Sequence, residues 1–220
     1  MAQNRIFLGT KRYSSWSLRG WLAVKLAGLE VEEVMLALAG GSTPAVKAAS
    51  PSGFVPYLEH DGNRIWDSLA IGEYCAELAP ALWPASRADR AHARSVAAEM
   101  HSGFRELRIN MPMSLFRNAK GAGRTEAVLA DIARIERVWA ETLARSGGPF
   151  LNGATPGIAD CMYAPVVFRF MTYAPELSVV SEAYCAMMRA HPLMQDWKAA
   201  ASVEPESWYI SSMEAPIVAG

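Results

Sequence analysis

The 220-residue sequence has no excess of either charge and little cysteine, and each shortage excludes a class of protein. Basic residues number 21 and acidic residues 22, so no cationic surface for nucleic acid or anionic lipid is expected. Apolar runs end well before the ~20 residues that a membrane span requires. No cationic segment followed by an apolar stretch marks the chain for export, so the expected location is the cytoplasm.

The three cysteines predict neither a disulfide framework nor a metal site. Cys75, Cys161 and Cys185 are odd in number and widely spaced, and no C-x-x-C pair or histidine cluster accompanies them. Each is expected to be a small core residue, and no metal is expected. There is also no internal repeat and no low-complexity tract.

The first eighty residues alternate between strand and helix patterns. Strands are predicted at 5–9, 31–38, 55–60 and 64–66, and helices at 17–27 (ended by Gly28) and 67–78, with a weak helical turn at 44–49. This order indicates an α/β module. Ligand sites of such modules lie at the loops beyond the strand ends, here near residues 13–16.

After Pro80 and Pro84 the strand pattern does not return. Apolar residues at helical spacing predict helices at 88–107, 125–144, 158–172, 177–190 and 193–200. The expected organisation is therefore an α/β domain at 1–79, a linker at 80–86 and an all-helical domain at 87–220. The tail at 204–220 carries Trp208 and Tyr209, so it is expected to pack back on the body and bury their rings.

Two short segments of the α/β module predict a peptide-binding site. Pro56 has no N–H, so it must lie at an edge or a bend, where Val55 offers its own N–H and C=O to an extended ligand. The helix that begins near Asp67 and Ser68 presents unpaired N–H groups and a positive dipole end, which suit a carboxylate. Separately, these residues also fit an ordinary edge proline and ordinary helix caps. Together they indicate a site for a peptide backbone and its free carboxylate.

These motifs resemble those of the cytosolic glutathione transferases over nearly the whole chain. The run Ser14-Ser15-Trp16-Ser17-Leu18-Arg19 is similar to the serine-type loop of the zeta class, which includes maleylacetoacetate isomerases. Residues 50–56 (SPSGFVP) and 66–71 (WDSLAI) are similar to the family's NPxGKVP and ESxAI motifs. Residues 157–160 (GIAD) resemble its buried capping box, with Gly157 in place of the usual hydroxyl residue, so that Asp160 caps the helix alone.

The resemblance implies a thioredoxin-like domain followed by a helical bundle, glutathione as co-substrate or coenzyme, and a homodimer. It assigns thiol activation to Ser14, with Ser15 as a substitute, and glutathione binding to six residues: Ser14, Phe54, Val55, Pro56, Asp67 and Ser68. Phe54 stands where many members have Lys or Gln, so one polar contact is missing or comes from elsewhere. The ligand's carboxylate is expected at Ser68 and its α-ammonium at Asp67.

The chemistry of the site leaves alternatives open. Ser14 and Ser15 either donate to the glutathione sulfur or only cap a helix, and Tyr13 is a rival donor because a phenol is more acidic. The electrophile is expected against the first helix of the bundle, at Met100, His101, Phe104, Arg105 and Arg108, although Met and Phe at this spacing also fit plain core. The two arginines would suit a maleyl-type diacid. The three functions considered are a transferase, a glutathione-dependent cis-trans isomerase and a non-catalytic binding protein.

Overall fold

A four-stranded sheet forms the frame of the N-terminal domain in the computed structural model, which describes residues 3–217. Its strands are β1 (Arg5–Gly9), β2 (Glu32–Leu36), β3 (Tyr57–His60) and β4 (Asn63–Ile65), in the spatial order β2-β1-β3-β4. β1 runs parallel to β2, whereas β3 is antiparallel to both β1 and β4. Because parallel neighbours need a crossover connection, a helix lies between β1 and β2 in the sequence.

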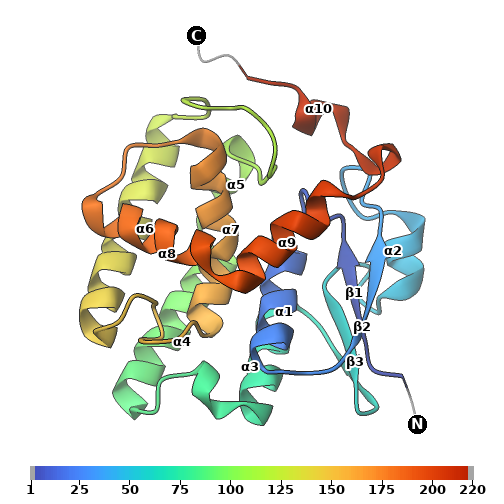
Figure 1. Ribbon diagram of the computed structural model, residues 1–220, viewed down its shortest axis with the longest axis horizontal. Helices are drawn as coiled ribbons and strands as arrows, with labels where there is room; N and C mark the ends of the chain where they lie inside the picture. Colours follow the sequence, from blue (N-terminus) through green and yellow to red (C-terminus); the bar gives the residue numbers. More distant parts are fainter. Residues whose placement is uncertain (1–2, 218–220) are drawn as a thin grey trace.

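Three helices complete this domain. α1 (Ser15–Leu26) and α3 (Ser68–Leu78) pack together between the sheet and the helical part of the molecule, and α2 (Pro44–Ala49) lies on the other side of the sheet (Figure 1). The core between sheet and helices contains fully buried Leu8, Leu18 and Ile71. The element order βαβαββα is that of a thioredoxin-like domain, which confirms the predicted fold class.

The element boundaries differ from the predicted ones in small ways that matter for the site. α1 begins two residues earlier than predicted, because Ser14 is its N-cap, and it ends at Leu26 with Gly28 following at φ +69°. β3 begins at Tyr57, directly after Pro56, so the proline precedes the strand rather than lying within it. Both the Val55–Pro56 and the Trp66–Asp67 peptide bonds are cis.

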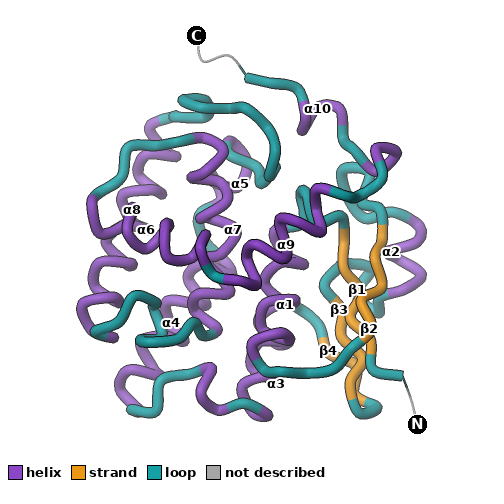
Figure 2. The backbone as a smooth tube through the Cα atoms, viewed as in Figure 1, coloured by secondary structure: helices purple, strands orange, loops and turns teal. Residues whose placement is uncertain are grey.

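The second part of the chain is helical, as predicted (Figure 2). A short 3-10 turn, η1 (Pro80–Leu82), leads into it, and its main helices are α4 (Arg87–Ser102), α5 (Arg105–Asn110), α6 (Glu126–Ser146), α7 (Ile158–Tyr173), α8 (Val179–Ala190) and α9 (Pro192–Ser202). α7 is buried on almost every side and packs against α1, α3 and α4, so it joins the two domains.

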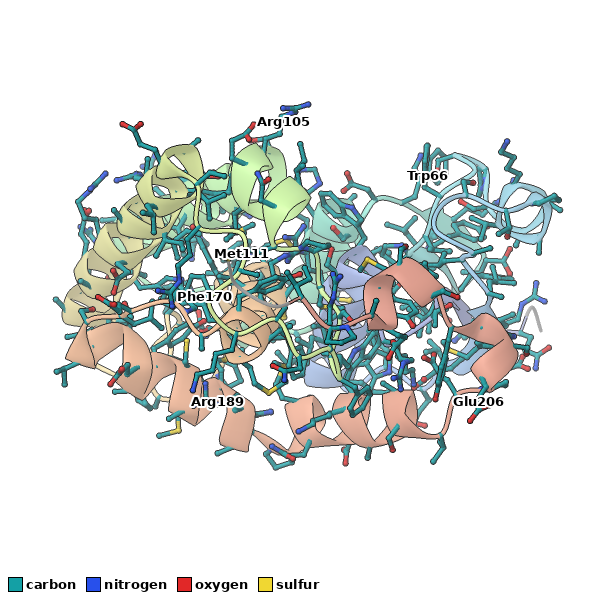
Figure 3. The ribbon with its side chains drawn as sticks, turned by 90° about the horizontal axis from the view of Figure 1, so that it is seen from above. Trp66, Arg105, Met111, Phe170, Arg189 and Glu206 are labelled. Atoms are coloured by element: carbon teal, nitrogen blue, oxygen red, sulfur yellow. The ribbon has the colours of Figure 1, made fainter. Side chains whose placement is uncertain are left out.

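The single helix predicted at 88–107 is wrong, because the chain turns between α4 and α5. Gly103 closes α4, and a Cβ there would lie 2.8 Å from the carbonyl oxygen of Glu99. Phe104 then has a left-handed φ of +57°, so α5 leaves in a new direction. Arg105, the first residue of α5, consequently points into solvent with 80% of its side chain exposed and pairs with Glu106 (Figure 3).

The tail packs back on the body over residues 204–217, as predicted, but Trp208 and Tyr209 are only half-buried; residues 218–220 lie outside the described part. It contains a 3-10 turn, η2 (Glu206–Trp208), and one short helix, α10 (Ser211–Glu214). Cys75, Cys161 and Cys185 are buried and unpaired, in agreement with their predicted place in the core. Among the described helices, none combines the length and apolar character needed to cross a bilayer.

Candidate functional site

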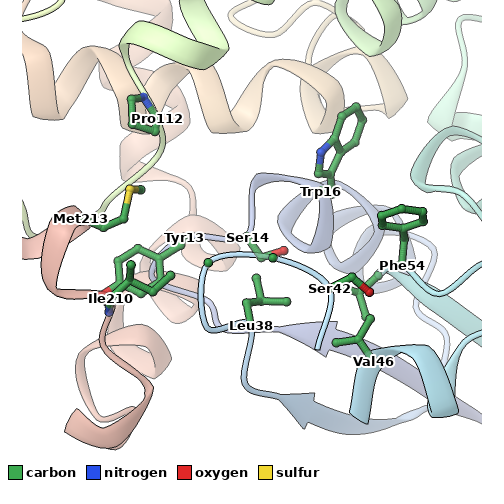
Figure 4. A pocket seen from close by; sticks show the side chains of 13 residues that line it. Tyr13, Ser14, Trp16, Leu38, Ser42, Val46, Phe54, Pro112, Ile210 and Met213 are labelled. Carbon is green, nitrogen blue, oxygen red and sulfur yellow. Dashed lines mark hydrogen bonds between the residues drawn. The ribbon is translucent and has the colours of Figure 1, made fainter. Parts of the chain in front are cut away.

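The loop between β1 and α1 borders a cavity of about 390 Å³, which we call the serine pocket (Figure 4). Its lining residues are Tyr13, Ser14, Trp16, Leu38, Gly40, Gly41, Ser42, Val46, Phe54, Val55, Pro112, Ile210 and Met213. Ser14 lies near the middle, with Tyr13 and Ile210 on one side and Trp16 and Phe54 on the other. No charged side chain is among these lining residues, so the pocket suits an apolar group beside a hydroxyl.

Ser14 is the only one of the two predicted serines that lines this pocket. Its Oγ accepts the N–H of Ser17 at 3.2 Å and donates to the Oγ of Ser17 at 2.8 Å. Ser15, the first residue of α1, is buried and lines neither this pocket nor the one described next. The placement favours Ser14 over Ser15, and it also shows that Ser14 caps the helix, so the two readings of this residue are compatible.

Tyr13 is a poor rival to Ser14. Its hydroxyl donates to a carboxylate oxygen of Glu214 and accepts the N–H of Ile210 at 3.2 Å. Burial and the bond to Glu214 raise the pKa of Tyr13 to about 12. The phenol proton is therefore held by the tail and is unavailable to a ligand in the serine pocket.

A second cavity, of about 380 Å³, continues from the serine pocket on the other side of Trp16. We call it the Asp67 pocket; it is lined by Trp16, Ser52, Phe54, Val55, Pro56, Trp66, Asp67, Ser68 and His101. Trp16, Phe54 and Val55 border both pockets, so the two form one trough. Within residues 3–217, no hydrogen bond engages the backbone N–H or C=O of Val55. This peptide group is free to pair with an extended ligand, as its position before Pro56 predicts.

The start of α3 supplies polar groups to the Asp67 pocket. Asp67 caps the helix, since its Oδ1 accepts the N–H of Leu69 at 2.9 Å and of Ala70 at 3.4 Å. The Oγ of Ser68 is buried without a hydrogen-bond partner in the described structure. An unsatisfied hydroxyl at a helix N-terminus is suited to an anion that supplies the missing acceptor.

His101, one of the residues expected at the electrophile site, reaches the Asp67 pocket from the helical domain and does not line the serine pocket. Its Nε2 lies 2.8 Å from Asp67 Oδ2, and its ring meets the edge of Trp16 with centroids 5.4 Å apart. Both oxygens of Asp67 are therefore engaged, one by the α3 backbone and one by His101. The sequence contains no local signal for this contact, because 34 residues separate its partners.

The other four residues predicted at the electrophile site lie elsewhere. Met100 is completely buried and Phe104 nearly so, both in the hydrophobic core, and Arg105 points away into solvent. Arg108 is turned inward: its guanidinium donates to the carbonyl oxygens of Gly103 and Met100. These side chains do not line either pocket. The structure gives these four residues no place in the two pockets for two reasons: Met100 faces the core from within α4, and the turn at Gly103 redirects the segment that carries Phe104, Arg105 and Arg108.

Trp16 packs against two arginine side chains, one completely buried and one half-buried. The guanidinium carbon of Arg19 lies 4.5 Å from the indole ring centroid and that of Arg108 lies 4.9 Å from it. Arg19 is completely buried, and its Nε donates to the carbonyl oxygen of Met162 at 3.0 Å. Cation–π contacts are worth about 0.5–1 kcal/mol at exposed sites and about 2 kcal/mol when desolvated, so these contacts fix the 38% exposed indole where the two pockets meet.

The C-terminal tail closes the serine pocket through residues that the sequence patterns did not reveal. Glu204 accepts the N–H groups of Lys11 and Arg12 at 2.6 and 3.1 Å, and Glu214 pairs with the Arg12 guanidinium at 2.9 Å. These bonds place Ile210 and Met213 against the pocket. Trp208 and Tyr209, the two aromatic residues that the sequence singled out in the tail, do not line the pocket, and the Tyr209 ring covers Arg12 instead.

Asp160 has a structural role, as predicted. Its carboxylate accepts the N–H groups of Leu151, Asn152 and Gly157 at 2.8, 3.2 and 2.9 Å, and the hydroxyl of Tyr184 at 3.0 Å. Burial raises the pKa of Asp160 to about 6 although these four donors oppose the rise. The side chain caps α7 and fixes the preceding loop, and it lies in neither pocket. In residues 3–217, no group of three or more His, Cys, Asp or Glu side chains is arranged to hold a metal ion.

The chain is similar in sequence to curated proteins and in fold to solved structures. The chain is similar to a probable maleylacetoacetate isomerase of Caenorhabditis elegans (28% identity over 200 residues, covering 88% of this chain and 89% of the other). It is also similar to a maleylacetoacetate isomerase of Rhizobium meliloti (29% over 201 residues, 81% and 92%). The crystal structure of a glutathione transferase homologue from Burkholderia, with bound glutathione, shares the fold at a TM-score of 0.70 (21% identity, 91% and 99%).

Two family profiles match the chain directly. Residues 13–78 match "Glutathione S-transferase, N-terminal domain", and residues 122–202 match "Glutathione S-transferase, C-terminal domain". The first match includes the loop of Ser14, the Val55–Pro56 step and the start of α3, and the second includes α7 with its Asp160 cap. With both domains matched in this order on the fold described above, the chain belongs to the glutathione S-transferase family.

Proposed function

We propose that this protein binds glutathione along the trough and activates its thiol for attack on small apolar electrophiles. The observation that carries the proposal is the continuity of the serine pocket and the Asp67 pocket past the unpaired peptide group of Val55. An extended tripeptide pairs its backbone with such a free edge. The sulfur then reaches Ser14 in one pocket while the γ-glutamyl end reaches Ser68 in the other.

The thiol chemistry follows from the surroundings of Ser14. A free thiol has a pKa of about 8.5, so only a few per cent is ionised at neutral pH. A hydroxyl donor and the positive end of the α1 dipole both stabilise a thiolate, which lowers that pKa and raises the reactive fraction. Tyr13 is excluded from this role by its bond to Glu214, so the proposal assigns it to Ser14.

The class of electrophile follows from the far side of the serine pocket. Beyond Ser14, the wall consists of Tyr13, Pro112, Ile210 and Met213. The two arginines expected to bind a diacid do not line it, because Arg105 faces solvent and Arg108 lies against Trp16. An apolar wall binds halogenated aromatics or similar compounds better than it binds a dicarboxylate. Affinity capture on glutathione, followed by a screen of halogenated aromatics, epoxides, peroxides and maleyl diacids, tests this proposal.

A cis-trans isomerase of maleyl diacids is the second candidate, favoured by the names of the two relatives with 28 and 29% identity and by the Ser-Ser-x-Ser loop. In that reaction the thiolate adds to the double bond, the new single bond rotates, and elimination regenerates glutathione. Product analysis separates the two: a transferase leaves a stable conjugate, whereas an isomerase returns free glutathione. Binding of glutathione with neither product would support the non-catalytic alternative.

The Asp67→Asn variant is expected to weaken glutathione binding about tenfold to hundredfold, because a hydrogen bond to a charged group is worth about 1.5–3 kcal/mol. Asparagine keeps an oxygen to cap α3 but loses the negative charge that we assign to the ligand's α-ammonium. Calorimetric titration measures the affinity, and thermal melting checks the cap. Asp89→Asn, at an exposed ion pair with Arg145, is the control. Equal affinities for Asp67→Asn and the control would refute the assignment.

The Met213→Ala variant is expected to lower kcat/KM for a bulky apolar electrophile roughly tenfold, since the lost apolar contact is worth about 1–2 kcal/mol. The KM for glutathione should stay unchanged, because Met213 lies on the opposite side of Ser14 from the Asp67 pocket. Met187→Ala, at an exposed methionine of α8, is the matched control. If kcat/KM falls by the same factor for small and bulky electrophiles, Met213 does not select the electrophile by its size.

A further inference from the structure

Ser17 makes hydrogen bonds that neither helix capping nor the roles proposed above explain. It is completely buried in the first turn of α1. Its Oγ accepts the N–H of Gly9, the last residue of β1, at 2.9 Å and also accepts the hydroxyl of Ser14 at 2.8 Å. A serine hydroxyl has two acceptor sites and one donor proton. Both acceptor sites are filled, and in the described part of the chain the proton of Ser17 has no acceptor.

A comparison within the same chain separates this arrangement from an ordinary cap. α8 begins with the same Ser-x-x-Ser pattern: Ser178 Oγ accepts the N–H of Ser181 at 3.3 Å and donates to its Oγ at 3.1 Å. Ser181 is also completely buried. Capping therefore accounts for the bond between the two serines in both helices. Only the pair in α1 adds the N–H of Gly9 on one side and a ligand-sized pocket on the other.

We infer that Ser17 is a positioning residue that aims the Ser14 hydroxyl at the glutathione sulfur, by reversing the hydrogen bond between the two serines when the sulfur enters the pocket. In the reversed chain, Gly9 N–H donates to Ser17 Oγ, the Ser17 hydroxyl donates to Ser14 Oγ, and the Ser14 hydroxyl donates to sulfur. No proton changes its owner, since each hydroxyl only rotates. The inference rests on the proposed binding of glutathione.

The reversal gives an acceptor to the one hydroxyl proton of this serine pair that lacks one within the described residues. The proton of Ser17 gains an acceptor, and Ser14 Oγ then accepts two bonds, from the N–H and the hydroxyl of Ser17. Hydrogen bonds that run in one direction polarise one another, so the terminal donor is stronger than an isolated serine hydroxyl. A residue with no contact to the ligand thereby affects the acidity of the thiol, whereas the peptide part of the ligand is held elsewhere, at Val55, Asp67 and Ser68.

The experiment compares Ser17→Ala, Ser17→Thr and Ser181→Ala with the wild type. The apparent pKa of bound glutathione is read from thiolate ultraviolet absorbance against pH, and KM and kcat are measured separately. Ser17→Ala should raise that pKa by about one unit, which leaves about tenfold less thiolate at neutral pH, with KM for glutathione changed less than about threefold. Ser17→Thr keeps the hydroxyl and should restore the wild-type value. Ser181→Ala should match the wild type.

Two results overturn the inference. The first is a folded Ser17→Ala protein in which bound glutathione has the wild-type pKa. The second is a Ser17→Thr protein in which bound glutathione has the raised pKa expected for Ser17→Ala. If Ser17→Ala does not fold, Ser17→Cys replaces it, because a thiol of similar size is a weak donor and acceptor, and the same rise in pKa is required. A wild type that fails to bind glutathione overturns the proposed function itself. A wild type that binds and ionises glutathione, with no change in the Ser17 variants, overturns only the role of Ser17.

Discussion

Replacing Ser14 by alanine should lower kcat/KM by about 100-fold, the loss typical of removing one donor to a developing or full negative charge in an active site. The pKa of bound glutathione should return toward about 8.5. The affinity for glutathione should change little, because the peptide contacts lie in the Asp67 pocket. Steady-state kinetics and the pH dependence of thiolate absorbance measure the two effects.

Ser14 also caps α1, so a matched control is needed to separate chemistry from stability. Ser178→Ala removes the equivalent cap of α8, with the same hydrogen bonds to the serine three residues on. Each variant should lose about 1 kcal/mol of unfolding free energy, and only Ser14→Ala should lose activity. If Ser15→Ala shows the loss of activity and Ser14→Ala does not, the sulfur is activated by the other serine.

Replacing Asp160 by alanine should lower the free energy of unfolding by about 4 kcal/mol or more. Three backbone N–H groups and one tyrosine hydroxyl donate to this carboxylate, and each would be left buried without an acceptor. Gly157, the N-cap of α7, has no side chain that could compensate. Urea denaturation, followed by tryptophan fluorescence, measures the loss.

The graded control for Asp160 is Tyr184→Phe, which removes one of the four donors and leaves the carboxylate in place. It should cost about 1 kcal/mol. The two variants together test whether the loop at residues 151–157 is fixed through the carboxylate. A loss below about 1 kcal/mol in Asp160→Ala would contradict the account, because such a loss is typical of a single exposed hydrogen bond.

The sequence predicted the parts of the site that depend on local chemistry. A proline without an N–H, a serine before a helix and an aspartate at a helix start each leave a pattern within a few residues, and the structure places Ser14, Val55 and Ser68 along one trough. The capping role of Asp160 came from the resemblance of residues 157–160 to the family's capping box, and the structure shows its carboxylate accepting the N–H of Gly157, three positions away.

The parts that the sequence left open or missed have two causes, one a contact between distant segments and the other a local turn. Tyr13 is held by Glu214, 201 residues later in the chain, and no periodicity records that pairing. The turn at Gly103 and Phe104 was missed because helical spacing of apolar residues continues across it, although glycine is a common helix end. That one turn moved Arg105 and Arg108 away from the pocket, and with them the predicted cationic wall.

The most direct test is a crystal structure of the protein with glutathione bound. The account predicts the cysteinyl sulfur within hydrogen-bond distance of Ser14 Oγ, the ligand backbone paired with Val55, and the γ-glutamyl carboxylate on Ser68. A sulfur that lies instead against Ser15 or Tyr13, or a glutathione bound outside the trough, would contradict it.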